Sequence, residues 1–301
     1  MLDVMGFGAL NMDRLYRVKR IAGADEESFI TGYTEAPGGS AANTMVGLAR
    51  LDVKTGCTGK LAQDREGRHL LQALVNEGVD VQGVIISEEG RSGVVLCFVD
   101  ETGERAMYVN PGVNDALTFH EIDVEHCCTT KFVHLTSFIG EHAFEVQQEL
   151  VKDLTRVKVS LDPGMHYAVK GFQALKPLLT KCYSIFPNES ELKLLTGEDY
   201  VRGSRALIEE GVQIVAVKLG KKGCYVTDGV ETHLIDAYQV KVMDTTGAGD
   251  AFCAGFLYGL LAGKDLYTCG RLGNYVASRK IGEKGARQGL PYKADLPSPL
   301  G

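Results

Sequence analysis

Strand-like runs and helical segments alternate along most of this chain, and this order constrains its fold more than any other feature. Apolar runs such as KFVHLTS (131–137), KVSLDPG (158–164) and CYSIFPN (182–188) alternate with segments whose apolar residues recur at helical spacing. Neighbouring parallel strands need long crossover connections, which are usually helices. The sequence therefore predicts an α/β fold with a doubly wound, mostly parallel sheet and helices on both faces, formed by residues 1–301 as a single domain.

Two segments, residues 14–35 and 91–109, interrupt the alternation. Both are rich in β-branched and aromatic residues, carry turn signals and lack an intervening helical pattern. VDETGERAMY (99–108) has the pattern of a hairpin. These insertions predict a small second sheet over one end of the main sheet, which serves either as a lid or as a peripheral brace.

The run MDTTGAGDAFCAGFLYGLLAG (243–263) places small residues before a long apolar helix. A helix N-terminus has unpaired N–H groups and a partial positive charge, and preceding glycines let an anion approach the backbone closely. Asp250 falls in the first turn, where it is either a favourable N-terminal carboxylate or a general base for a hydroxyl that attacks a phosphoryl group. A simple cap needs no Gly-Ala-Gly run, so the pattern favours the catalytic role.

A second helix start, PGGSAANTMVGLARL (37–51), also begins with glycines. Asn43 falls in its second turn and could offer an amide to a substrate hydroxyl, although small residues also allow close helix packing. Other phosphate motifs are missing, since the sequence has no GxxxxGK[ST]. GFGALN (6–11) lacks the last glycine of a dinucleotide fingerprint, which leaves an oxidoreductase as a minor alternative.

Charge and cysteine usage narrow the class of protein. A formal net charge of −7 provides no basic face for nucleic acid and no polybasic anchor for a membrane. MLDVMGFGAL (1–10) lacks the pattern of a signal peptide, and no apolar run approaches the ~18 residues of a membrane span. The 8 cysteines form no CxxC pair, so they indicate reduced thiols in a cytoplasmic protein, with Cys127 and Cys128 structural.

The two glycine-rich helix starts resemble the two signature regions of the ribokinase-like, or PfkB, family of carbohydrate and nucleoside kinases. DTTGAGDAFCAGF and GGSAANTMVGLARLD match in order and separation, and NMD, NESE and KLGKKG match smaller family motifs, from about Asp3 to Pro291. The resemblance implies a ribokinase-like fold and the transfer of the γ-phosphoryl group of ATP, with Mg²⁺, to a hydroxyl of a sugar. The alternatives are a nucleoside kinase and a non-catalytic nucleotide-binding regulator. The regulator is disfavoured because every residue expected at the phosphate end is present.

At the phosphate end, the resemblance implies that Asp250 is the catalytic base. The anion hole for the transferring group would then be Gly247, Ala248 and Gly249.

For the metal and the nucleotide, the resemblance assigns five further residues. Asn188 and Glu191 match a motif that organises Mg²⁺ through water, which suits the preference of this ion for water and few carboxylates. Without the family, Glu191 would be a solvated first-turn acid. Gly220 and Gly223 match the turn beside the ATP ribose, and Asn274 matches the residue next to the adenine.

Three further positions belong to this end of the site. Lys218 is grouped with the nucleotide-binding residues, but many relatives have a small or polar residue there and its role stays open. Asp244 and Thr246 match positions whose backbone carbonyls hold a monovalent cation in some members, which makes K⁺ a candidate cofactor.

For the acceptor, Asn11 and Asp13 in LNMDRL match positions that bind sugar hydroxyls, together with Gly39 and Asn43. A carboxylate accepts two hydrogen bonds and an amide both donates and accepts, so the Asn11 and Asp13 pair suits a vicinal diol. Relatives dimerise through their lid sheets, and the resemblance therefore implies a homodimer.

The identity of the acceptor stays open. VHLTSF (133–138) lacks the acidic or amide pair that ribokinases place after the middle strand, so ribose itself is not favoured. Arg105 with Tyr108 resembles the acid-sugar kinases. NMD and the long second insertion favour a sugar, and a nucleoside comes next. A base pocket for a nucleoside could be formed by Phe29, Phe98, Tyr108 and Phe138.

Overall fold

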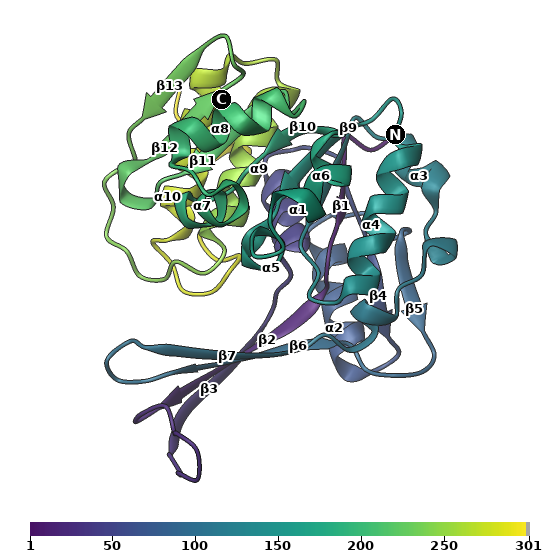
Figure 1. The fold of residues 1–301 in the computed structure, drawn as a ribbon. Coiled ribbons are helices and arrows are strands. Elements are labelled where there is room, and N and C mark those ends of the chain that lie inside the picture. The colour runs from purple at the N-terminus through teal and green to yellow at the C-terminus, as the bar shows by residue number, and fades with distance from the viewer. Residues whose placement is uncertain (299–301) are drawn as a thin grey trace.

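The computed structural model describes residues 1–298, which form a large main sheet and a smaller sheet beside it (Figure 1). The main sheet has nine strands in the order β13-β12-β11-β10-β9-β8-β1-β4-β5. All neighbouring pairs from β11 to β5 are parallel, and β12 and β13 extend one edge as antiparallel strands. In sheet order, the strands are β13 (Thr232–Ile235), β12 (Cys224–Thr227), β11 (Ile214–Lys218), β10 (Cys182–Ile185), β9 (Lys158–Asp162), β8 (Phe132–Thr136), β1 (Val4–Phe7), β4 (Thr55–Ala62) and β5 (Val84–Ser87).

Helices cover both faces of the main sheet, as the alternating side chains of its strands require. Val4 and Ala216 belong to one buried cluster and their neighbours Met5 and Val215 to the other. On the Val4 face lie α1 (Ser40–Arg50), α2 (Arg65–Asn76), α9 (Ala248–Leu261) and α10 (Leu266–Lys280). On the Met5 face lie α3 (Val124–Cys128), α4 (Glu141–Asp153), α5 (Gly164–Ala168), α6 (Phe172–Leu179), α7 (Glu189–Thr196) and α8 (Tyr200–Glu209). Together with the small sheet, this confirms the predicted fold class.

One helix differs from the pattern in the sequence. The apolar residues of 144–157 have the spacing of a single helix, but α4 ends at Asp153. Leu154 and Val157 lie beyond this helix, in the connection to β9, where both are buried. Because they are three residues apart, their spacing imitates one turn of a helix.

The second, four-stranded sheet has the order β3-β2-β6-β7 and projects from the main body as a long arm (Figure 1). Its strands are β2 (Asn11–Val18), β3 (Ile30–Pro37), β6 (Gly93–Val99) and β7 (Arg105–Asn110). On one face, Tyr16 stacks on Phe98 at a centroid distance of 5.1 Å and also contacts Tyr33. The predicted insertions therefore do form a small sheet, with an aromatic cluster on one side.

Two features bear on the class of protein. No helix among residues 1–298 is long and apolar enough to cross a membrane. All the cysteines are free thiols, and of the vicinal pair Cys127 is buried while Cys128 is exposed.

Candidate active site

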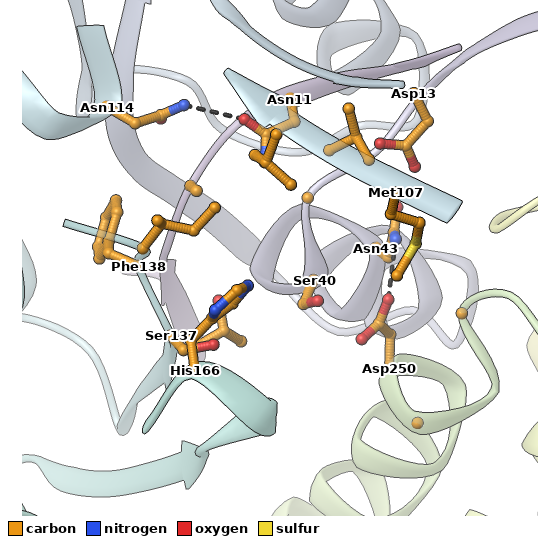
Figure 2. Close-up of a pocket in the computed structure, with 18 of the residues that line it drawn as sticks. Asn11, Asp13, Ser40, Asn43, Met107, Asn114, Ser137, Phe138, His166 and Asp250 are labelled. Carbon is orange, nitrogen blue, oxygen red and sulfur yellow. Dashed lines mark hydrogen bonds between the residues drawn. The ribbon is translucent and has the colours of Figure 1, made fainter. Parts of the chain in front are cut away.

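A cavity of about 350 Å³ opens where β1 and β8 end, close to β2 and to the start of α9. In the main sheet, β1 lies between β4 and β8, so the strand order runs away from β1 in both directions. Doubly wound sheets bind ligands in the crevice beyond the strand ends at such a point. We call it the Asp250 cavity; Figure 2 shows side chains from β2, α1 and α9 around it. The predicted acceptor and phosphate residues all line it: Asn11, Asp13, Gly39, Asn43, Gly247, Ala248, Gly249 and Asp250.

Asp250 is a buried carboxylate in the first turn of α9. Burial raises its pKa from 3.8 to about 6, and the charge of Asp162 adds to this rise, whereas a hydrogen bond from Asn43 opposes it. Helix α9 is buried along most of its length and packs closely on α1, where a Cβ on Gly47 would lie 2.8 Å from that of Ala254. The small residues of α1 therefore also serve helix packing, and they hold the first turn of α9 in place.

Asn43 has two protein partners for its amide group. Its Nδ2 donates to Oδ2 of Asp250 at 2.8 Å, and its Oδ1 accepts from Nε of Arg287 at 2.8 Å. The side chain was expected to offer its amide to a substrate hydroxyl, but only one N–H remains for that. Arg287, which is buried, was missed in the sequence because nothing in the run around it marks it as part of a site.

The backbone before α9 and the first turn of this helix form what we call the anion cradle, and residues 245–250 line the Asp250 cavity. Gly247 caps the helix with φ 76°, and a Cβ there would lie 2.6 Å from the carbonyl oxygen of Ala286. The amide of Ala248 donates to the carbonyl of Thr245 at 3.1 Å, so it is already used in a turn. Within residues 1–298, the amides of Gly249 and Asp250 have no acceptor, as expected for the first turn of a helix. These two amides are therefore the ones open to an anion.

On the other side of the cradle, Lys218 and Asp162 form a largely buried ion pair of 2.7 Å between Nζ and Oδ2. Burial disfavours the charged ammonium, but Asp162, Cys253 and Glu191 together raise the pKa of Lys218 above its ordinary value. Nζ lies 3.2 Å from the position that a Cβ on Gly249 would take, so the ammonium adjoins the cradle. Asp162 was missed in the sequence, although an acid at the end of a predicted parallel strand is a usable signal.

Asn188 and Glu191 face a second cavity of about 360 Å³, the Lys218 cavity, which meets the Asp250 cavity at Ser40, Ser137 and Asp250. The two side chains form a capping box at the start of α7: the amide of Asn188 donates to Oε2 of Glu191 at 2.7 Å, and the amide of Glu191 donates to Oδ1 of Asn188 at 2.8 Å. Glu191 is buried rather than solvated, and burial followed by the charge of Asp162 raises its pKa.

Lys218 and Gly220 also line the Lys218 cavity, but the other two predicted nucleotide residues do not. Gly223 has φ 94°, and a Cβ there would lie 1.9 Å from the carbonyl oxygen of Ile235. Asn274 is buried, and its Nδ2 donates to the carbonyls of Ile235 and Asp236. Both residues therefore hold the chain after β13 in place.

On the opposite side of the Asp250 cavity, Asn11 and Asp13 extend from β2 (Figure 2). Burial raises the pKa of Asp13 to about 7, the charge of Asp250 adds to this rise, and Arg287 opposes it. Oδ1 of Asn11 accepts a hydrogen bond of 3.0 Å from Asn114, which also binds both backbone groups of Leu10. Asn114, which the sequence gave no signal for, thus fixes the start of β2.

The lining of the Asp250 cavity is acidic and contains one phenyl ring. Of the residues 1–298, no lysine or arginine lines it, whereas the carboxylates Asp13, Asp115 and Asp250 do. Phe138 and His166 supply its aromatic side chains. The prediction that Phe29, Phe98 and Tyr108 join Phe138 in an aromatic pocket is wrong. Phe98 and Tyr108 pack edge to face on the side of the small sheet that carries Tyr16, and Phe29 is exposed. None of these three lines the cavities described.

A third cavity, of about 850 Å³, adjoins the first and lies between the small sheet, residues 243–246, residues 284–286 and Gln288; we call it the Arg105 cavity. Nη2 of Arg105 lies 3.8 Å from Oδ1 of Asp244. The Asp244 carboxylate also accepts from the amide and hydroxyl of Thr246 and from the amide of Gly285. The backbone carbonyl of Asp244, predicted to hold a monovalent cation, accepts a hydrogen bond of 2.9 Å from Nζ of Lys280.

Comparisons with known proteins bear on the family and the fold of this chain. Residues 1–293 match the model of the pfkB family carbohydrate kinase. An uncharacterized sugar kinase from Archaeoglobus fulgidus is 46% identical over 253 residues, which cover 83% of this chain and 100% of the relative. An ATP-dependent ribose-1-phosphate kinase from Halopiger xanaduensis is 33% identical over 95% of this chain and 94% of its own. The structure of an Arabidopsis thaliana ribokinase complexed with ribose and ATP superposes with a TM-score of 0.87 at 26% identity, covering 97% of this chain and 96% of that one.

Proposed function

Because the chain belongs to the pfkB family of carbohydrate kinases, which transfer a phosphoryl group to an alcohol, we propose that it phosphorylates a hydroxyl of a sugar held between Asn11, Asp13 and Asp250. The observation that carries this proposal is the position of Asp250. Its carboxylate lines the Asp250 cavity in the same helical turn as the open amides of the anion cradle. A base and an anion site in one turn suit phosphoryl transfer to a bound hydroxyl.

Asp250 would take the proton of the attacking hydroxyl. A general base works best when its pKa is close to the working pH. Burial raises the pKa of Asp250 to about 6, so the carboxylate is a stronger base than an exposed aspartate and is still mostly ionised at neutral pH. The amides of Gly249 and Asp250 and the ammonium of Lys218 would stabilise the negative charge of the transferring group.

ATP would lie along the Lys218 cavity, with its γ-phosphoryl group where the two cavities meet. Asp162 and Glu191 are the residues that would hold Mg²⁺ there, through water and beside the phosphates, and two buried carboxylates fit an ion that keeps most of its waters. When bound, Mg²⁺ neutralises charge on the phosphate oxygens. Burial raises the pKa of Glu191 and the charge of Asp162 adds to this rise, while Lys218 opposes it; a further cation beside the two carboxylates would relieve their repulsion.

A neutral sugar fits the Asp250 cavity best. Its carboxylates accept hydrogen bonds from hydroxyl groups, and no cationic side chain of residues 1–298 in its lining would balance an anionic acceptor. A nucleoside is a weaker candidate, because the predicted base pocket is reduced to Phe138.

A sugar phosphate is the second candidate, and one observation favours it. The Halopiger xanaduensis relative is named for ribose-1-phosphate, and in this chain Arg105 and Lys284 line the adjoining Arg105 cavity. A phosphate on the acceptor could reach these two cations while its hydroxyl faces Asp250.

The small sheet would act as a lid and as the dimer interface. Its cavity-facing side carries Val95 and Met107, and its other side carries the Tyr16 cluster, in which Tyr33 and Tyr108 are exposed. An exposed aromatic sheet face is suited to a second copy of the chain. Light scattering after gel filtration should give the mass of a dimer, and Tyr33→Lys should shift it toward a monomer. The buried free thiols suit a reducing compartment such as the cytoplasm.

Release of ADP in a coupled assay tests the acceptor. The panel contains free aldoses and ketoses, ribose 1-phosphate, a sugar acid and adenosine, each with ATP and Mg²⁺. A neutral sugar should give the highest kcat/KM, and Arg105→Met should leave that value nearly unchanged. If ribose 1-phosphate is preferred and Arg105→Met abolishes the preference, the second candidate replaces the first. If none of the compounds on the panel supports ADP release, the proposed function is contradicted.

A further inference from the structure

Lys280 is a fully buried cation at the end of α10. Its Nζ donates a hydrogen bond of 2.9 Å to the backbone carbonyl of Asp244. The next residue, Ile281, accepts from the amides of Met243 and Asp244 through its own carbonyl. The end of α10 thus binds the segment that leads into the anion cradle by one side-chain and two backbone hydrogen bonds.

The Asp244 carbonyl is one of the two groups that the resemblance assigned to a monovalent cation. The site does not fit K⁺, because the ammonium of Lys280 already binds this carbonyl. A K⁺ on the same oxygen would lie a few ångströms from a buried positive charge, where little water screens the repulsion. The carboxylate of Asp244 is not free either, since Thr246 and Gly285 donate to it and Arg105 lies near it.

The bonded segment positions the cradle directly. Residues 244–246 lead into Gly247, whose backbone contacts Ala286 so closely that a Cβ would lie 2.6 Å from the Ala286 carbonyl oxygen. Movement of the Asp244 carbonyl would therefore shift the first turn of α9, which carries the open amides and Asp250. A buried charge needs a specific partner to be tolerated, so the bond to Asp244 fixes the segment strongly.

We propose that the ammonium of Lys280 is a built-in monovalent cation, which holds residues 243–246 and the anion cradle in place and makes the protein independent of K⁺. Lys280 is a positioning residue in this proposal, since it acts through the backbone of Asp244. The inference rests on the proposed kinase function for its effect on turnover. Its effect on stability does not depend on that function.

The first test uses the unaltered protein. Thermal unfolding and turnover are measured in potassium, ammonium and tetramethylammonium chloride at equal ionic strength. A cation that binds the native state raises Tm by mass action, so the expected result is the same Tm in all three salts. Turnover should change by less than about twofold, too little to reflect a specific effect on the barrier. A saturable rise in Tm or turnover with K⁺ alone would overturn the proposal, and the Tm result stands even if no acceptor is found.

The second test removes the cation and offers a replacement. Lys280→Ala leaves space beside the Asp244 carbonyl, so we expect low Tm and turnover in tetramethylammonium and a saturable recovery of both in K⁺ or ammonium. Lys280→Met fills the space with a neutral chain and should show the losses without the recovery. Arg279→Met is the matched control, because Arg279 is the adjacent, exposed cation of the same helix turn and should behave like the unaltered protein. A Lys280→Ala variant with full, salt-independent turnover would overturn the role of the ammonium; if that variant does not fold, the first test decides.

Discussion

Asn43 donates a hydrogen bond of 2.8 Å from Nδ2 to Oδ2 of Asp250 and so joins α1 to the first turn of α9, across 207 residues of sequence. An amide can turn either its oxygen or its nitrogen toward a neighbour, and only the nitrogen suits a carboxylate. Arg287 settles the orientation, because its Nε donates to Oδ1 of Asn43 at 2.8 Å. The buried guanidinium therefore determines which group Asn43 presents to the proposed base.

Replacing Arg287 should change the pH profile more than the affinity for substrates. Without the guanidinium, Asn43 loses its fixed orientation and Asp250 loses a nearby positive charge, so the pKa of Asp250 should rise. For Arg287→Met we expect the acid limb of kcat/KM to move to higher pH, and for Arg287→Lys a smaller shift. A purely structural role would instead lower Tm and leave the limb where it is.

Asp250→Asn should abolish most turnover while the protein folds and binds both substrates. The amide occupies the same space and can present its oxygen to Asn43, but it cannot accept a proton. General-base catalysis is worth about 10²- to 10⁴-fold, so kcat should fall by a factor in that range. Steady-state assays measure the loss of turnover, and calorimetric titration with ATP measures the retained binding. Near-normal turnover would contradict the assignment of Asp250 as the base.

The same carboxyl makes stability depend on pH in a definite direction. Burial raises the pKa of Asp250 from 3.8 to about 6, so the native state binds a proton more tightly than the unfolded chain does. The contribution of Asp250 to stability is then greatest at a pH below 3.8, the pKa in the unfolded chain, and is lost as pH rises through the native-state pKa of about 6. Relative to the unaltered protein, Asp250→Asn should be more stable at pH 7.5, by up to about 3 kcal/mol, and should lose this advantage near pH 4. Urea unfolding at several pH values measures this difference; an advantage that does not vary with pH contradicts the raised pKa.

The fold and the residues of the phosphate end could be predicted because their signals are local. Strand and helix patterns repeat over short windows, and the glycine run before Asp250 lies in one helix start. Asn188 and Glu191 are likewise close in sequence and bind one another. The roles of these residues could be proposed because their motifs resemble those of the family, except for Lys218, whose role stayed open.

The remaining contacts depend on which segments the fold brings together. Arg287 binds Asn43 across 244 residues, and Lys280 reaches Asp244 from another helix. The aromatic residues of the small sheet show a second limit. Phe98 and Cys97 are neighbours in β6, yet Cys97 lines the Arg105 cavity and Phe98 packs on the opposite face. Alternation along a strand decides this, and the sequence does not say which face meets the cavity.

Asp13 should govern binding of the acceptor rather than of ATP. It lines the Asp250 cavity from β2 and does not line the Lys218 cavity. Asp13→Ala removes two hydrogen-bond acceptors for sugar hydroxyls, so we expect the acceptor KM to rise at least about tenfold, the loss that accompanies a hydrogen bond to a charged group. The KM for ATP should stay nearly constant; an equal rise in both would indicate a folding role.

The pair of Lys218 and Asp162 allows stability and turnover to be separated. Lys218→Met leaves Asp162 and Glu191 buried without their cation, and breaking such a pair costs about 3 to 5 kcal/mol of stability. Adding Asp162→Leu removes one of the stranded charges, so the double variant should recover much of the lost stability. Turnover should stay low in both variants, because the ammonium beside Gly249 is missing in both.

The buried Lys60 provides the control for this comparison. Nζ of Lys60 lies 2.6 Å from Oε1 of Glu121, and neither residue lines the cavities described. Lys60→Met should therefore lower the free energy of unfolding without lowering kcat. If the Lys218→Met/Asp162→Leu variant recovers turnover together with stability, Lys218 only holds the fold. If stability returns and turnover does not, the deficit is chemical rather than structural, and it reflects the missing ammonium of Lys218 together with the missing carboxylate of Asp162, which would hold Mg²⁺.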